Sequence, residues 1–291
     1  MQTITTLEPL RSSVDELRES GRIALVPTMG ALHQGHLTLI REAAKLADHV
    51  AASIFVNPRQ FGPNEDLGAY PRQLAEDSAK LEAEGVALLW APDVKVMYPQ
   101  GYATNISVAG VSEGLCGGDR PGHFDGVATV VCKLFNQVRP DIALFGEKDW
   151  QQLAVIRRMA RDLDLVLPHA DAIHGVPTVR EADGLAMSSR NAYLSPEQRT
   201  LAAEFPASLR HAIGMMLNGS EILLAKAVAE DDLQLAGVRV DYIEVVDAET
   251  LEPLEQLGER PARIVAAVRI GGTRLIDNMS VSGTGRANPV E

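Results

Sequence analysis

The sequence predicts an α/β protein in which a doubly wound, Rossmann-like parallel sheet is followed by a smaller α+β domain. Three observations favour this fold class. Apolar residues make up 46% of the chain and charged residues 23%, which is typical of globular proteins. Short apolar runs alternate with amphipathic stretches over the first 175 residues. This alternation ends after Pro177, so we expect one domain at residues 1–175 and another at residues 176–281.

The elements of the first domain alternate between strand and helix, the order that builds a parallel sheet with helices on both faces. Short apolar runs predict strands at residues 22–27, 50–56, 86–91 and 141–145. Amphipathic segments predict helices at residues 35–48, 71–84, 125–138 and 149–163. In the first of these helices, the apolar residues Leu37, Ile40 and Ala44 fall on one face.

The second domain has helices first and strands later, an order that favours a small antiparallel sheet. Helices are predicted at residues 196–217 and 220–235, and strands at residues 238–246, 263–270 and 274–281. Gly271 and Gly272 separate the last two strands, which predicts a tight hairpin. The Gly- and Pro-containing tail at residues 282–291 is expected to be flexible.

The charge of the chain excludes several functional classes. The formal net charge is −12 and basic residues form no cluster, so a nucleic-acid partner is not expected. The chain has no run of 18 apolar residues and no signal-peptide core, which predicts a cytoplasmic protein without a membrane partner. Cys116 and Cys132 lack the spacing of a zinc site and are expected to be reduced thiols.

The strongest local signal is a loop with the sequence PTMGALHQGHL at residues 27–37. It joins the first predicted strand to the first predicted helix, at the sheet edge where open α/β folds bind their ligands. Gly30 and Gly35 let the backbone approach a ligand closely. The helix that begins near Gly35 directs free N–H groups and its positive dipole end toward that ligand. The loop therefore predicts a site for an anionic group.

Known motifs explain this loop poorly. A Walker A loop needs Lys and then Ser or Thr after Gly35, where His36 and Leu37 stand, and the dinucleotide fingerprint G-x-G-x-x-G is absent. His33 and His36 alone give a metal ion only two ligands. The remaining functional interpretation is that both imidazoles donate hydrogen bonds to a phosphate in its transition state. The alternative is a structural role, in which the histidines cap the helix or fill the loop.

A second group of polar residues is predicted near the same sheet edge. Lys148 follows the strand at residues 141–145 and supplies a basic point charge suited to phosphates. Asp149 is interpreted in three ways: it binds a nucleotide hydroxyl, it binds Mg²⁺, or it caps the helix that follows.

A polar turn later in the chain offers further phosphate ligands. Ser188, Ser189 and Arg190 supply hydroxyls, a guanidinium and backbone amides, which suit an oxyanion. A turn of this composition usually has no binding role. Its functional interpretation is favoured here because the chain also contains the loop at residues 27–37, which we call the histidine loop. We expect residues 28–36, 146–149 and 187–190 to converge around one triphosphate.

Five separated motifs carry a resemblance to one protein family. They are PTMGALHQGHL, SIFVNPRQFG at residues 53–62, RPGHFDG at 120–126, LFGEKDWQQ at 144–152 and GLAMSSRN at 184–191. The first is similar to the His-x-Gly-His motif of the nucleotidyltransferase superfamily, which includes the class I aminoacyl-tRNA synthetases. In order and wording, the five resemble the pantothenate synthetase (pantoate–β-alanine ligase) family over residues 20–195, with a weaker match to the end.

The resemblance implies an ATP-dependent ligase that condenses pantoate with β-alanine through a pantoyl-adenylate intermediate, releasing AMP and pyrophosphate. It also implies Mg²⁺ as a cofactor and a homodimer. The two-domain layout itself suggests closure of the second domain over a cleft near residue 175. The catalytic residues that it implies are His36, His33 and Lys148. The ATP-binding residues that it implies are Met29, Gly30, Ala31, Leu32, His33, Gln34, Gly35, His36, Gly146, Glu147, Lys148, Asp149, Val179, Met187, Ser188, Ser189 and Arg190.

The same resemblance implies that Gln60 and Gln152 hold pantoate and that Gln60 borders the β-alanine site. Buried amides can fix hydroxyl and carboxylate groups without adding charge, although solvent-facing glutamines are the plainer interpretation of these two residues alone. Arg120 and His123 are candidates for the lining of the same cleft. No residue is assigned to a metal ion.

Three rival functions stay open. The first is a nucleotidyltransferase that acts on another small acceptor, which would need a basic site for a phosphorylated substrate. The second is a tRNA synthetase, which the acidic charge and the length of the chain disfavour. The third is a nucleotide-sensing module that binds ATP without turnover.

Overall fold

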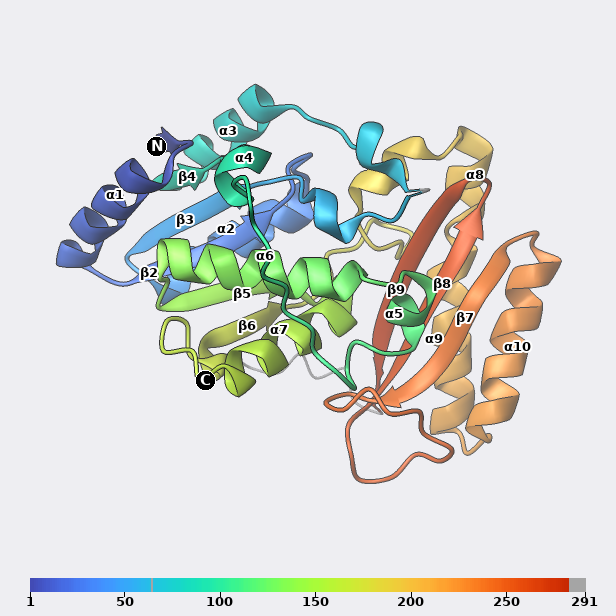
Figure 1. Cartoon of the computed structure of the whole chain (residues 1–291). Helices are drawn as coiled ribbons and strands as arrows, with labels where there is room; N and C mark the ends of the chain where they lie inside the picture. Colours follow the sequence, from blue (N-terminus) through green and yellow to red (C-terminus); the bar gives the residue numbers. More distant parts are fainter. Residues whose placement is uncertain (64, 283–291) are drawn as a thin grey trace. The chain divides into compact units, whose positions relative to one another are not determined.

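The computed structural model describes residues 1–63 and 65–282, and these fall into two compact units, Met1–Val179 and Arg180–Glu291. The first unit contains a parallel sheet with helices on both faces, and the second contains an antiparallel sheet with helices packed on it (Figure 1). The predicted fold class is therefore confirmed. The tail predicted at residues 282–291 lies outside the described residues, apart from Ser282.

The first unit is built on six strands in the order β1-β4-β3-β2-β5-β6. All neighbouring strands run parallel, so every strand ends at the same edge of the sheet. The strands are β1 (Gln2–Ile4), β2 (Ile23–Thr28), β3 (His49–Ile54), β4 (Leu88–Trp90), β5 (Ile142–Gly146) and β6 (Ile173–Val176).

Helices cover both faces of this sheet (Figure 1). On one face α2 (Gln34–Leu46) packs beside α3 (Leu74–Ala83), and on the other α6 (His123–Val138) packs between α1 (Leu7–Ser20) and α7 (Trp150–Asp162). The shorter helices of the unit are α4 (Val94–Met97), α5 (Leu115–Asp119) and the 3₁₀ turns η1 (Pro58–Gln60), η2 (Asp66–Gly68), η3 (Glu147–Asp149) and η4 (Ala170–Ala172).

The order of the strands places two loops side by side. The chain runs from β2 to β3 and β4 on one side of β2, and it then returns to β5 on the other side. The connections after β2 and β5 therefore leave the sheet edge in opposite directions from neighbouring strands. Open α/β folds bind ligands at such a reversal of strand order. The loops that follow Thr28 and Gly146 both begin there.

The second unit packs three helices on a three-stranded antiparallel sheet. The strands are β7 (Arg239–Asp247), β8 (Ala262–Ile270) and β9 (Thr273–Val281), and the helices are α8 (Pro196–Leu201), α9 (Glu204–Leu217) and α10 (Ile222–Leu235), with the 3₁₀ turn η5 (Ser189–Tyr193) before them. Gly271 has a φ of 57° in the two-residue hairpin between β8 and β9, as its sequence predicts. Phe205, Leu209 and Ile264 lie in the core of this unit.

The single helix predicted at residues 196–217 is wrong: α8 ends at Leu201 and α9 begins at Glu204. The reason is Pro206, which lies in the first turn of α9. A proline has no N–H to donate, and its ring would clash with the carbonyl of Ala202 in a continuous helix. The chain therefore breaks before the proline and starts a new helix.

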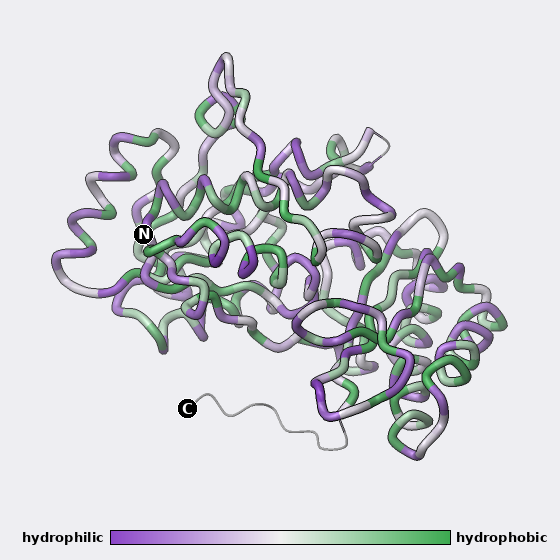
Figure 2. The backbone as a smooth tube through the Cα atoms, turned by 60° about the horizontal axis from the view of Figure 1, so that its bottom comes forward, coloured by the Kyte–Doolittle hydropathy of each residue, from purple (hydrophilic) through white to green (hydrophobic). Residues whose placement is uncertain are grey.

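Three short or weakly patterned elements of the first unit are not anticipated from the sequence. The strands β1 and β6 have only three and four residues, too few for a clear apolar pattern. Helix α1 buries only Leu10, Ser13 and Val14. In Figure 2 the helices alternate between hydrophobic and hydrophilic positions, as amphipathic helices do. No helix in the described part of the chain has the length and apolar character that crossing a membrane requires.

Gly126 of α6 allows a close approach to η1, and its replacement tests this packing. A Cβ atom at Gly126 would lie 2.3 Å from the Arg59 carbonyl oxygen and 2.7 Å from the Gln60 nitrogen. We expect Gly126→Ala to lower the free energy of unfolding by about 1–3 kcal/mol, because the backbone must move apart. Urea denaturation measures this change.

Gly214 of α9 provides the matched control, because a Cβ atom there would meet nothing within 4 Å. Gly214→Ala should raise the free energy of unfolding by about 0.5–1 kcal/mol, since alanine favours a helix. Equal stability of the two variants would contradict the contact described between α6 and η1.

Candidate functional site

The loop after β2 has an unusual backbone. Gly30 has a φ of 86° and Ala31 a φ of 51°, so two successive residues adopt the left-handed region. Glycine enters this region freely, whereas alanine does so at a cost. Leu32 then packs into the core, and His33 begins helix α2 as its N-cap residue. The loop is therefore held in one conformation immediately before the two histidines.

His33 and Gly35 fit each other closely. The Nδ1 atom of His33 accepts a hydrogen bond from the Gly35 N–H at 3.1 Å. A Cβ atom at position 35 would lie 2.9 Å from the His33 Cε1 atom. Glycine at this position is therefore required by the imidazole that folds onto it, which gives a physical reason for the spacing of the motif.

His36 caps the same helix end in return. Its Nδ1 atom accepts from the His33 N–H at 3.3 Å, and the two ring centroids are 4.2 Å apart. A ring nitrogen that accepts a hydrogen bond carries no proton, so each neutral imidazole bears its proton on Nε2. The structural and functional interpretations of His36 are therefore compatible, because its capping bond uses Nδ1 and its Nε2–H can act as a donor.

His36 is neutral at physiological pH. The pKa of His36 is lowered to about 3, mainly by burial and also by His33, Lys148 and Lys80, while Asp149 acts in the opposite direction. The cause is that burial disfavours the charged imidazolium. His36 can therefore donate a hydrogen bond without carrying a formal charge.

Lys148 and Asp149 lie close enough to act on His36 electrostatically. The Lys148 Nζ atom is 3.6 Å from the Asp149 Oδ2 atom. Asp149 stands at the N-cap position of α7, as one of its interpretations predicts, but its side chain makes no capping bond. The structure thus brings the histidine loop and residues 146–149 together, at the neighbouring carboxyl ends of β2 and β5.

Glu147 points elsewhere. A Cβ atom built at Gly175 of β6 would lie 3.0 Å from the Glu147 Cγ atom, and Glu147 also raises the pKa of Arg157, which burial lowers. Its side chain is thus turned toward β6 and α7. Gln34 is exposed, and its Oε1 atom accepts from Arg41 at 3.4 Å.

Gln60 is fixed beside the histidine loop. Its Oε1 atom accepts from the Asn57 Nδ2 atom at 3.1 Å, and its Nε2 atom lies 3.1 Å from the Met29 Sδ atom. Asn57 is held in turn, because its Oδ1 atom accepts from the Tyr98 hydroxyl at 2.8 Å and its Nδ2 atom donates to the Gly126 carbonyl at 3.0 Å. The Gln60 amide is thus buried and oriented, with a second N–H of Nε2 left for a ligand.

Arg120 and His123 hold the backbone of Gln60. Arg120 donates to the Gln60 carbonyl at 3.2 Å and to Glu65 Oε1 at 2.7 Å. The His123 Nδ1 atom is 2.8 Å from the same carbonyl, so it carries the proton. The pKa of His123 is lowered to about 4, mainly by burial and also by the neighbouring Arg120. These two residues act on Gln60 through its main chain.

Gln151 and Gln152 differ in role although they are adjacent on α7. Gln151 is buried, and its amide holds the loop before α5 by accepting from the Cys116 N–H and donating to the Val111 and Glu113 carbonyls. Gln152 is partly exposed, and no hydrogen bond of its side chain is found among the described residues. Its amide therefore remains available to a ligand. Val179, partly exposed, is the last residue of the first unit.

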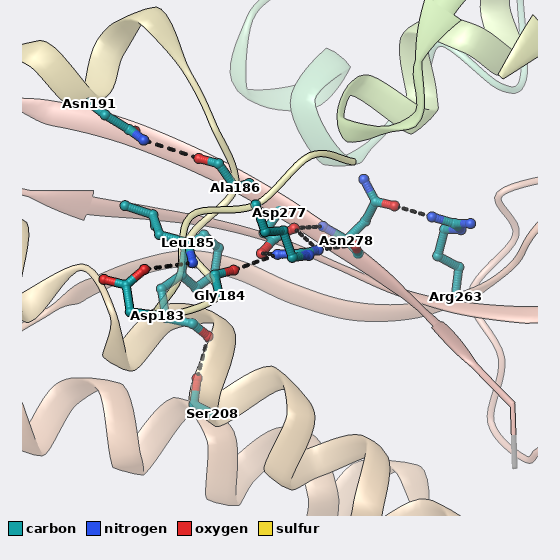
Figure 3. Close-up of polar contacts among 11 residues, drawn as sticks. Asp183, Gly184, Leu185, Ala186, Asn191, Ser208, Arg263, Asp277 and Asn278 are labelled. Carbon is teal, nitrogen blue, oxygen red and sulfur yellow. Dashed lines mark hydrogen bonds and ion pairs between the residues drawn. The ribbon is translucent and has the colours of Figure 1, made fainter. Parts of the chain in front are cut away.

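The turn at residues 187–190 belongs to the second unit, where other contacts support it. The Ser188 hydroxyl accepts from the Arg190 N–H at 3.3 Å, and Asn191 donates to the Ala186 carbonyl at 3.1 Å. The preceding segment is tied to β9 by Arg180, whose guanidinium donates to both oxygens of Asp277 at 2.7 and 2.8 Å. Figure 3 shows Gly184, Ala186 and Asn191 around this part of the chain. Met187 and Ser189 complete the turn.

Two residues of α3 belong to the site although the sequence does not single them out. Asp77 accepts hydrogen bonds from the loop after β2, and Lys80 donates to a carbonyl of that loop. A signal for Asp77 exists in the sequence, because it shares the buried face of the helix with Leu81. An acidic residue at a core-facing position needs donors around it.

A metal ion would have few protein ligands here. In residues 1–63 and 65–282, no three His, Cys, Asp or Glu side chains lie together in an arrangement that could hold one. Cys116 and Cys132 are both buried and do not form a disulfide with each other.

Comparisons with known proteins agree on one family. A sequence model described as pantoate-beta-alanine ligase matches residues 2–280. The pantothenate synthetase of Novosphingobium aromaticivorans is 66% identical over 283 residues, 97% of this chain and 99% of that protein. The solved pantothenate synthetase of Thermus thermophilus has a TM-score of 0.91 at 46% identity, covering 97% of this chain and 99% of its own.

A further solved structure carries ligands. It is the pantoate-beta-alanine ligase of Francisella tularensis, complexed with beta-gamma ATP and beta-alanine. Its TM-score is 0.80 at 33% identity, and the match covers 97% of this chain and 98% of that one.

The protonation of His36 can be measured directly. We expect ¹⁵N-histidine NMR to show His36 with Nε2–H and Nδ1 unprotonated at pH 7, because Nδ1 accepts from the His33 N–H. The resonances should stay unchanged as the pH falls through 6.5, since burial holds the pKa near 3. Titration of His36 between pH 6 and 7, or an Nδ1–H tautomer, would contradict the geometry. The exposed His169 serves as an internal reference.

Proposed function

The chain belongs to the pantoate–β-alanine ligase family, and on that premise we propose that its histidine loop forms the acyl adenylate from which the product amide is made. The chain is an ATP-dependent ligase that joins pantoate to β-alanine. A nucleotidyltransferase acting on another acceptor is not favoured, since relatives at up to 66% identity over nearly the whole chain are pantothenate synthetases.

One observation supports the proposed chemistry most strongly: two imidazoles share a helix N-terminus and accept their capping bonds at Nδ1. Donors fixed before the reaction stabilise the charge that develops on a phosphate without reorganising. The helix N-terminus adds the positive end of its dipole. The histidine loop therefore suits the α-phosphate of ATP.

The first step activates the acid. A carboxylate is a poor acyl donor, because an oxide would have to leave. In the proposed step a pantoate carboxylate oxygen attacks the α-phosphorus, the bond to the β-phosphate breaks, and pyrophosphate departs with its electron pair. His36 and His33 donate to the α-phosphate oxygens during this exchange, and Lys148 balances charge on the departing phosphates. The chain needs no nucleophile of its own, because its task is positioning and charge stabilisation.

Two amides position pantoate in this proposal. Gln60 keeps an N–H beside Met29 of the histidine loop, and its carbonyl oxygen is already engaged by Asn57, so the amide meets the ligand as a donor. A carboxylate or hydroxyl oxygen suits that donor. Gln152 supplies a second amide from α7. Because both side chains are uncharged, they hold the carboxylate without lowering its nucleophilicity through ion pairing.

The remaining ATP contacts rest on the family resemblance. Ser188, Ser189 and Arg190 are proposed to bind the β- and γ-phosphates, with Met187 beside them. The backbone of Val179 is proposed to meet the adenine. Residues 29–35 and 146–149 complete the proposed set, in which Glu147 takes part through its main chain, because its side chain is turned toward Gly175.

Mg²⁺ is proposed as the cofactor that travels with ATP. Asp149 fits it as a single carboxylate ligand, because its side chain is partly exposed and makes no capping bond. Mg²⁺ in nucleotide sites is often coordinated by one or two protein carboxylates together with substrate phosphates, which agrees with a single carboxylate here. When bound, the ion would neutralise charge on the phosphates.

The second step makes the amide bond. The β-alanine amine attacks the acyl carbon of pantoyl adenylate, the acyl–oxygen bond breaks, and AMP departs as the amine loses a proton. Gln60 borders both substrates in this proposal. We also propose that the enzyme is a homodimer and acts in the cytoplasm, as the resemblance implies.

Pyrophosphate release separates the proposed function from its rivals. With ATP and pantoate alone, the enzyme should release about one pyrophosphate per active site and then slow, because the adenylate stays bound. Adding β-alanine should restore continuous release and produce AMP. A chain that only senses ATP would release none, and a need for a phosphorylated acceptor would contradict the proposed chemistry.

Two variants of His36 test the role of its Nε2–H group. Asparagine can replace the Nδ1 acceptor but lacks a donor at the Nε2 position, whereas glutamine extends an N–H toward it. His36→Asn should slow pyrophosphate release by roughly 10²- to 10³-fold, the usual effect of losing one such donor. His36→Gln should retain more of the rate. If His36→Asn releases pyrophosphate at the wild-type rate, His36 is not the donor.

A further inference from the structure

Asp77 is a buried carboxylate that accepts hydrogen bonds from the backbone of the histidine loop. It lies on α3 with none of its surface exposed, 46 residues along the chain from Ala31. Its Oδ2 atom accepts from the Ala31 N–H at 2.8 Å, and its Oδ1 atom accepts from the Leu32 N–H at 2.9 Å. Gln73 donates to Oδ1 as well, at 3.2 Å. Both carboxylate oxygens are thus engaged by donors of the chain itself.

Lys80, one turn further along α3, donates a hydrogen bond to the same loop. Its Nζ atom donates to the Leu32 carbonyl at 2.9 Å and lies 3.7 Å from Asp77 Oδ1. Residues three apart on a helix face the same side, so the pair approaches the loop together. One helix therefore satisfies two N–H groups and one carbonyl within two consecutive residues.

These contacts hold a conformation that the loop would not adopt unaided. Gly30 and Ala31 both have positive φ, and the Cβ atom of alanine makes this conformation unfavourable. Sparsely populated backbone conformations persist only where their surroundings hold them. The two N–H groups that follow this turn point at one carboxylate, so its charge is what holds them.

We propose that Asp77 and Lys80 are positioning residues for adenylate formation: they hold residues 30–32 so that His33 and His36 present their Nε2–H groups to the α-phosphate. The inference rests on the proposed function of the histidine loop. Neither residue touches the reacting atoms in this proposal, and both act through the main chain of the loop. A displacement of about 1 Å in such a loop can lower a rate by about 100-fold.

A matched pair of variants separates positioning from folding. In Asp77→Asn one oxygen becomes an NH₂ group, so one of the two N–H groups of the loop loses its acceptor. Asp141→Asn is the control, because Asp141 also accepts a backbone N–H, that of Ile23 at 2.8 Å, and pairs with Arg18. Asp141 precedes β5 at the opposite end of the strand from the histidine loop.

Both variants should unfold at lower urea concentration than the wild type. Only Asp77→Asn should lower kcat for pyrophosphate release, by about tenfold or more, with KM for ATP and pantoate changed by less than about threefold. If the wild-type enzyme releases no pyrophosphate, the proposed function itself fails. If the wild type is active and both variants keep its kcat, the positioning role is overturned.

If Asp77→Asn does not fold, Lys80→Met tests the positioning role instead. The Lys80 side chain is 37% exposed, so this variant should still fold. The lysines Lys148 and Lys80 lower the pKa of His36, and Asp149 raises it. Removing the Lys80 charge should raise the pKa of His36, as read by ¹⁵N-histidine NMR, and lower kcat. An unchanged kcat together with an unchanged His36 pKa would overturn the inference.

Discussion

The position of β2 between β3 and β5 is the constraint on which the candidate site depends. Because the chain reverses direction across the sheet at this point, the loops that follow β2 and β5 are neighbours although more than 100 residues separate them. The histidine loop and Lys148 thus meet at one edge of the sheet. The parallel sheet supplies the juxtaposition, and local contacts then set the geometry of each side chain.

The electrostatic character of the site follows from burial as much as from charge. The chain carries a formal net charge of −12, yet it must bind a triphosphate. In the proposed site His36 is a neutral donor, since burial keeps its pKa near 3, and positive charge comes from Lys148, from nearby Lys80 and from the proposed phosphate ligand Arg190. Neutral Nε2–H donors also hold their protons throughout the reaction, so the rate of adenylate formation should not depend on histidine titration near neutral pH.

The sequence predicts the sheet and the loop at its edge, whereas the long-range side-chain contacts are seen only in the structure. The alternating pattern of the first 175 residues, with the glycines and histidines of residues 27–37, was enough to predict the parallel sheet and the loop at its edge. It could not show which backbone Asp77 holds, because a hydrogen bond to a loop 46 residues away leaves no periodic pattern. It also could not distinguish Gln151, whose amide supports the loop before α5, from Gln152, whose side chain makes no hydrogen bond found among the described residues. The break before Pro206 was visible in the sequence but was outweighed by the apolar pattern around it.

A crystal structure of the enzyme with a non-hydrolysable ATP analogue and pantoate would test the central claim most directly. The account predicts an α-phosphate oxygen within hydrogen-bonding distance of the His36 Nε2 atom, the pantoate carboxylate against Gln60, and Lys148 beside the outer phosphates. A triphosphate bound beyond the reach of both imidazoles, with the loop after β2 making no contact to it, would contradict the account.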